Sequence, residues 1–128
     1  MSESAARTLY ELFNARRFDE LGCAIAEDCE FHHRPQWPGD GAFKGRDGVI
    51  EAMRDLHDVI PGLYNVPSEF GQVAADTWII RVNQGLADDS GQPRETETVF
   101  HLMRFDDSDR MRELRSFSTR EEVLAAAQ

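Results

Sequence analysis

The sequence predicts an α+β domain in which helices come first and a run of consecutive strands follows. Apolar residues recur at helical spacing in the first half of the chain, and after residue 62 the period changes to strand-like alternation. Pro61-Gly62 marks the change, because this pair breaks helices. The expected order, α-α-β-α-β-β-β-β-α, favours helices packed on one face of a strongly curved, mostly antiparallel sheet. Such a sheet forms a cone, and the mouth of a cone is a natural ligand site.

Four helices are expected. The first covers roughly residues 4–16, where Ala5, Leu9, Leu12 and Phe13 share one face. A second, short helix begins at Phe18-Asp19 with Leu21, Ala24 and Ile25 inside, and the third runs from near Asp47 to the Pro61-Gly62 breaker. The last begins at Thr119, which forms a capping box with Glu122.

Five strands are expected between and after the helices. Their ranges are Cys29–His33, Leu63–Val73, Thr77–Ala87, Glu95–Phe105 and Met111–Ser118. Residues 88–93 and 106–109 have turn composition. Alternation puts Trp78, Ile80 and Val82 on one face and Arg81 and Asn83 on the other.

Size and charge limit the function classes. The 128 residues fit one domain, 1–128, without repeats or linkers. A net charge of −10 argues against nucleic-acid partners, since phosphate binding needs Lys and Arg. Cys23 and Cys29 fall in different elements, which indicates free thiols and a reducing compartment. The N-terminus does not resemble a signal peptide and no apolar run approaches the ~20 residues of a membrane span, so we expect a cytoplasmic protein.

Several short motifs, in their order along the chain, resemble one family. They are Phe18-Asp19-Glu20-Leu21, Glu27-Asp28-Cys29-Glu30-Phe31-His32, Phe43-Lys44-Gly45-Arg46-Asp47-Gly48-Val49 and the closing Arg112-Glu113-Leu114-Arg115-Ser116-Phe117-Ser118. Together they resemble the SnoaL-like branch of the nuclear transport factor 2-like superfamily, from about residue 5 to 124. The resemblance implies a homodimer with a cone-shaped pocket, as in ketosteroid isomerases, polyketide cyclases, epoxide hydrolases and dehydratases.

The resemblance disfavours two of these activities. When this chain is aligned with ketosteroid isomerases, their general base falls at His33 and their oxyanion Asp falls at His101. Their oxyanion Tyr falls at Leu9, and Tyr10, one residue on, is expected to turn away. Epoxide hydrolases of this fold need an Asp-Arg-Asp set, but Ser116 and Asn83 stand at the two carboxylate positions. A steroid isomerase and an epoxide hydrolase are therefore both disfavoured.

His33 and His101 are the candidate catalytic residues. Alternation puts His33 inward and His32 outward, so the adjacent histidines make a poor metal pair, and we expect no metal. If both side chains face one cavity, His33 and His101 are expected to form a general acid/base pair. Such a pair suits isomerisation, cyclisation or dehydration without a cofactor. In the alternative interpretation each is a buried polar residue in a protein that only binds its ligand or serves as an accessory subunit. His57 is expected at the surface.

The inward positions predict an apolar cavity for a small hydrophobic molecule, of ~300 Å³ or more. Its expected lining is Phe31, Met53, Trp78, Val82, Val99, Met103 and Leu114, with Gln84, Ser116 and Ser118 as polar points and Trp37 as a lid. In the alternative, these side chains meet and fill the cone. A homodimer is expected through the outer sheet face, where Thr96, Thr98, Phe100, Leu102, Arg115 and Phe117 would lie.

Overall fold

The computed structural model describes residues 2–32 and 42–128. The helices are α1 (Ser2–Asn14), α2 (Phe18–Cys23), α3 (Arg46–Val59) and α4 (Arg120–Ala127). The strands are β1 (Ile25–His32), β2 (Ala42–Lys44), β3 (Leu63–Ala74), β4 (Thr77–Ala87), β5 (Pro93–Phe105) and β6 (Met111–Phe117). Within these ranges, no helix is long and apolar enough to cross a membrane.

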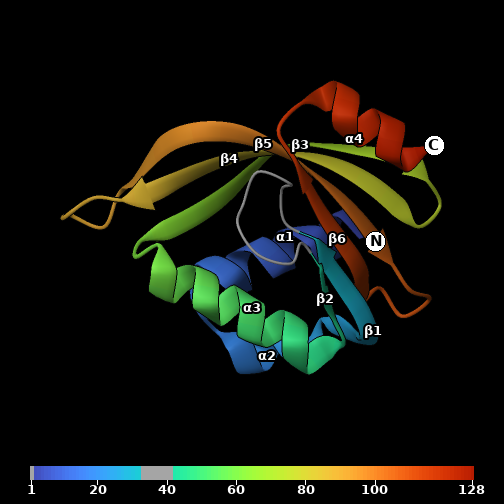
Figure 1. The fold of residues 1–128 in the computed structure, drawn as a ribbon, viewed down its shortest axis with the longest axis horizontal. Helices are drawn as coiled ribbons and strands as arrows, with labels where there is room; N and C mark the ends of the chain where they lie inside the picture. Colours follow the sequence, from blue (N-terminus) through green and yellow to red (C-terminus); the bar gives the residue numbers. More distant parts are fainter. Residues whose placement is uncertain (1, 33–41) are drawn as a thin grey trace.

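One six-stranded sheet organises the fold. Its strand order is β2-β1-β6-β5-β4-β3, with β1 parallel to β6 and every other neighbouring pair antiparallel. The sheet curves over α1, α2 and α3, and α4 lies on its opposite, convex face (Figure 1). The α+β class, the early helices and the mostly antiparallel curved sheet are confirmed.

Two predictions between residues 24 and 44 were wrong. Ile25, placed on a helix, begins β1; it pairs with Met111 of β6 and is fully buried. The chain also has a strand that was not predicted, β2, whose Phe43 pairs with Phe31 of β1. A strand of three residues is too short to show a period, so only its pairing reveals it.

His57 is buried, which corrects its expected surface position. It is 4% exposed, its Nε2–H donates to the Phe13 carbonyl oxygen at 2.8 Å, and its ring lies 4.4 Å from the Phe13 ring. Burial lowers the pKa of the imidazole, although the Phe13 hydrogen bond opposes this shift. The spacing explains the position, because Val49, Met53 and His57 follow one another at intervals of four along the buried face of α3.

The C-terminal helix covers part of the outer sheet face. The predicted capping box is confirmed: Thr119 Oγ1 accepts from the Glu122 N–H at 3.2 Å, and the Glu122 carboxylate accepts from the Thr119 N–H at 3.1 Å. The helix places Val123 against Ile79 and Leu102, and both Val123 and Leu102 are fully buried. The apolar positions that predicted a homodimer are therefore covered, in part, by the chain's own helix.

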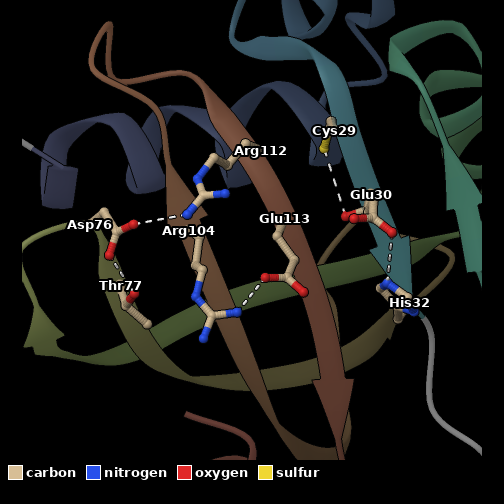
Figure 2. Close-up of polar contacts among 8 residues, drawn as sticks. All are labelled: Cys29, Glu30, His32, Asp76, Thr77, Arg104, Arg112 and Glu113. Carbon is tan, nitrogen blue, oxygen red and sulfur yellow. Dashed lines mark hydrogen bonds and ion pairs between the residues drawn. The ribbon is translucent and has the colours of Figure 1, made fainter. Parts of the chain in front are cut away.

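The rest of the outer face carries charges. Figure 2 shows Arg104 of β5 paired with Glu113 of β6, and Glu30 beside His32 on β1. His32 Nε2 lies 3.7 Å from Glu30 Oε1. His32 thus lies on the side opposite the buried Phe31, as strand alternation predicts. These polar contacts make this part of the face polar.

Both cysteines are free, one exposed and one buried. Burial, reinforced by Asp28, Glu30 and Glu113, raises the pKa of the Cys29 thiol to about 12. Since the thiolate is the reactive form, Cys29 is chemically inert at neutral pH.

Candidate functional site

A largely apolar cavity lies between the helices and the concave face of the sheet. Its described lining is Leu9, Tyr10, Phe13, Leu21, Phe31, Met53, Leu56, Leu63, Asn65, Gln84, His101, Met103, Met111, Leu114 and Ser116. The space open to the centres of water-sized molecules is about 60 Å³. The expected ~300 Å³ was wrong, since aromatic and methionine side chains from both sides fill much of the cone.

The most specific polar contact in the cavity joins a tyrosine to a histidine. Tyr10 Oη and His101 Nδ1 lie 2.6 Å apart, and both side chains are 5% exposed. The rings are stacked, with centroids 5.8 Å apart and planes 10° apart. Burial raises the pKa of the Tyr10 phenol far above its ordinary value, so the phenol keeps its proton at neutral pH and can donate it to Nδ1. In that arrangement a neutral His101 carries its proton on Nε2.

The position of Tyr10 corrects the expectation that it turns away. Leu9 and Tyr10 both line the cavity, although consecutive helical residues point about 100° apart. Both can do so because the cavity extends around one side of α1. Ala6, Tyr10 and Phe13 lie at helical spacing and are all buried, so helical periodicity could have predicted that Tyr10 faces inward.

Three further polar residues enter the cavity from the sheet. Asn65 of β3 and Gln84 of β4 are cross-strand partners, and Ser116 of β6 is the cross-strand partner of His101. Asn65 is 8% exposed, and its Oδ1 is buried without a hydrogen-bond partner. Apart from the Tyr10 hydroxyl on α1, the polar groups of the described lining therefore come from the sheet.

Seven of the residues named from the sequence line this cavity: Phe31, Met53, Gln84, His101, Met103, Leu114 and Ser116. Four others lie elsewhere. Val82 and Val99 are cross-strand partners, fully buried in the core, so neighbouring side chains fill the space before them. Trp78 is half-buried against the core, and Ser118 follows the end of β6. His33 and Trp37 lie outside the described residues.

Eight lining residues were missed as cavity residues: Leu9, Tyr10, Phe13, Leu21, Leu56, Leu63, Asn65 and Met111. Leu63 and Asn65 alternate on the inner face of β3, so strand periodicity could have found them. Met111 begins β6 directly after a turn, and only the sheet register brings it to the cavity.

The hydrogen-bonding groups of the described lining are a phenol, an imidazole, two amides and a hydroxyl. In residues 2–32 and 42–128, no group of three or more His, Cys, Asp or Glu side chains is placed to hold a metal ion. The described lining also contains no Asp, Glu, Lys or Arg. What the arrangement can do chemically is donate or accept a proton through the Tyr10–His101 pair and orient a ligand through amides and a hydroxyl.

Comparisons with known proteins agree with this fold. A family model described as "SnoaL-like domain" matches residues 6–114. An NTF2-like protein of unknown function from Burkholderia pseudomallei is 21% identical, with a TM-score of 0.74, and the match covers 97% of this chain and 95% of that one. TerC, crystallised with polyporic acid, is 17% identical with the same TM-score and coverage.

A protein from Sinorhizobium meliloti proposed to be a polyketide cyclase is 14% identical, with a TM-score of 0.69, over 91% of this chain and 98% of that one. None of the curated proteins matches this chain at a significant level. At such identities the solved structures share the fold with this chain, and its own residues must carry the argument about function.

Proposed function

The chain belongs to the SnoaL-like family, and we propose that it binds a small, uncharged, largely apolar molecule in the cavity and performs cofactor-free acid/base chemistry on it. The observation that carries this proposal is the Tyr10 Oη–His101 Nδ1 contact of 2.6 Å inside the cavity. A buried, protonated phenol that donates to an imidazole fixes the ring's tautomer and makes His101 a donor through Nε2. A donor fixed in this way can stabilise negative charge on a ligand oxygen.

In the proposed reaction a base removes a proton from the carbon next to a carbonyl, and His101 stabilises the resulting enolate oxygen. The base then returns the proton to another carbon, which gives isomerisation, or transfers it to a β-hydroxyl group that leaves as water, which gives dehydration. We propose His33 as the base, on the resemblance to ketosteroid isomerases alone.

A second candidate, a non-catalytic binding or accessory protein, is favoured by the cavity's size and lining. A volume of about 60 Å³ is well below the ~300 Å³ of ordinary ligand sites, and the described lining has no carboxylate to act as base. The two candidates differ in one observable: the second binds a ligand without accelerating proton transfer.

Hydrogen–deuterium exchange on cyclopentanone, a small uncharged ketone, tests the proposal. The loss of its α-proton signals in D₂O is followed by NMR with the wild-type protein and with His101→Gln, Tyr10→Phe and His33→Ala. We expect the wild type to accelerate exchange over buffer and His101→Gln to lose about 10²-fold of that acceleration, as is typical of a lost acid/base group. His32→Gln is the matched control, because His32 lies on the opposite face of β1 and should leave the rate unchanged.

Methyl-labelled methionine reports binding in the same samples. Met53, Met103 and Met111 all line the cavity, so a bound ketone should shift their methyl signals. Shifts without accelerated exchange would support the non-catalytic candidate. If this ketone causes no methyl shifts and shows no accelerated exchange, the result contradicts both candidate functions.

We also propose a homodimer, now through the outer sheet face beside α4. Arg115 and Phe117 are half-buried there and can contribute to a contact. Because α4 covers part of this face, the proposed interface is smaller than the sequence suggested. Sedimentation that gives a stable monomer at micromolar concentration would count against it.

A further inference from the structure

One side-chain oxygen in the cavity has no hydrogen-bond partner among the residues that the structure describes. Asn65 points inward from β3, is 8% exposed and lines the cavity, and its Oδ1 is buried without a hydrogen-bond partner. A buried acceptor without a partner costs about 1–3 kcal/mol, so folded proteins seldom keep one unless something else uses it. In a cavity of this kind, such an acceptor is a recognition group for the donor of a small ligand.

The backbone of Asn65 is held in place from the opposite side of the cavity. Asn14 Nδ2–H donates to the Asn65 carbonyl oxygen at 2.8 Å, and the Asn65 N–H donates to Asn14 Oδ1 at 2.9 Å. Asn14 lies one helical turn after Tyr10 on α1, so a single helix positions both Asn65 and His101. This pair of bonds fixes where the Asn65 side chain leaves the strand.

The surroundings indicate the charge of the ligand group that meets Asn65. Within the described residues, the cavity lining contains no charged side chain. A charged ligand would lose its hydration without gaining a counter-ion, which is costly in an apolar site. The polar neighbour across the strands is Gln84, an uncharged amide. An uncharged ligand is therefore favoured.

We infer that Asn65 is a specificity-determining residue that selects uncharged ligands carrying a hydroxyl or N–H group as hydrogen-bond donor. This inference rests on the proposed function to the extent that the ligand occupies the same cavity. The donor group meets Asn65 Oδ1, and the oxygen that reacts lies toward His101. Hydroxy-ketones are the ligand class that combines both features.

Pyrrole and furan form a matched pair of probes, because the two five-membered rings have nearly the same size and only pyrrole carries an N–H donor. Binding is measured by titration against protein labelled with ¹⁵N and with ¹³C-methyl methionine. The signals followed are the Asn65 side-chain amide and the methyls of Met53 and Met103. One net hydrogen bond predicts that pyrrole binds about 3–10-fold more tightly than furan.

Three variants locate this preference. Asn65→Leu has a similar shape without the acceptor and should reduce the ratio to about one, while Asn65→Asp retains an acceptor oxygen and should keep the preference for pyrrole. Asn83→Leu is the matched control, since Asn83 is the next residue to Gln84 on β4, does not line the cavity and also has a buried Oδ1 without a partner. The ratio should be unchanged in this control.

The outcomes separate this inference from the proposed function. Equal binding of both probes, or tighter binding of furan, with shifts at the methionine methyls would overturn the role of Asn65 and leave cavity binding intact. If neither probe shifts any cavity signal at its solubility limit, both ideas fail. A preference for pyrrole that survives in Asn65→Leu would place the acceptor elsewhere and also refute the inference.

Discussion

Replacing Tyr10 by Phe removes one oxygen atom from the cavity. The change should lower the free energy of unfolding and alter the tautomer of His101. The hydrogen bond to His101 Nδ1 is short, at 2.6 Å, and buried. A hydrogen bond contributes about 0.5–1.5 kcal/mol net, and a buried nitrogen left without its partner adds a desolvation cost, so the expected loss is about 1–3 kcal/mol. For a chain of 128 residues, this corresponds to a fall in Tm of roughly 4–11 °C.

Urea denaturation measures the stability, and the ¹⁵N shifts of the His101 imidazole report its tautomer. We expect Tyr10→Phe to lower the unfolding midpoint and to move the proton distribution between Nδ1 and Nε2, because the phenol no longer occupies Nδ1. Tyr64→Phe is the control: Tyr64 is half-buried and does not line the cavity, so its change should stay within about 0.5 kcal/mol. A Tyr10→Phe loss as small as that of the control, with unchanged imidazole shifts, would refute the reasoning.

Three further predictions concern positions outside the proposed chemistry. The folded-state pKa of His57 lies below its unfolded value of about 6.5, so the unfolded chain binds the proton first as the pH falls. The free energy of unfolding should therefore decrease as the pH drops from about 7 through that value, by at most about 1.4 kcal/mol per pH unit. His57→Gln should flatten this slope in urea titrations, whereas His32→Gln should not; equal slopes in all three proteins would exclude His57 as the cause. Asn14→Ala should destabilise the fold by about 1–3 kcal/mol, since two backbone groups of Asn65 lose their partners, and an unchanged midpoint would show that water replaces both bonds. Val123→Ala should cost about 1–3 kcal/mol and expose amides of β4 and β5 to hydrogen exchange, and unaltered protection would mean that α4 does not cover the sheet in solution.

The later strands and the last helix follow from the sequence because their signals are local. Ile80 and Val82 alternate with Arg81 and Asn83, and Thr77–Ala87 is the observed strand as predicted. The capping box at Thr119 depends on residues only three positions apart. Hydrophobic period and helix capping depend on residues close together in the sequence, so they can be predicted without any knowledge of the fold.

The candidate site follows from the sequence only in part. Sheet alternation led to Met103, Leu114 and Ser116, and the resemblance to ketosteroid isomerases led to His101. All four line the cavity. Alternation could not show that neighbouring side chains cover Val82 and Val99 while the cavity stays open elsewhere along the sheet. Which inward position faces space and which faces a neighbour depends on how α1 and α3 lie across the sheet.

The sequence by itself determined the class of fold and the inward face of most strands, because hydrophobic periodicity and turn residues encode these locally. It also indicated the family, through short motifs whose order resembles that of SnoaL-like proteins. The tertiary structure decided which polar groups meet in the cavity. Tyr10 and His101 are 91 positions apart and Asn14 and Asn65 are 51 apart, so only the packing of α1 against the curved sheet brings each pair within hydrogen-bond distance. The same packing set the cavity's small volume and placed α4 over the outer face, since both depend on how side chains from distant segments fill a shared space.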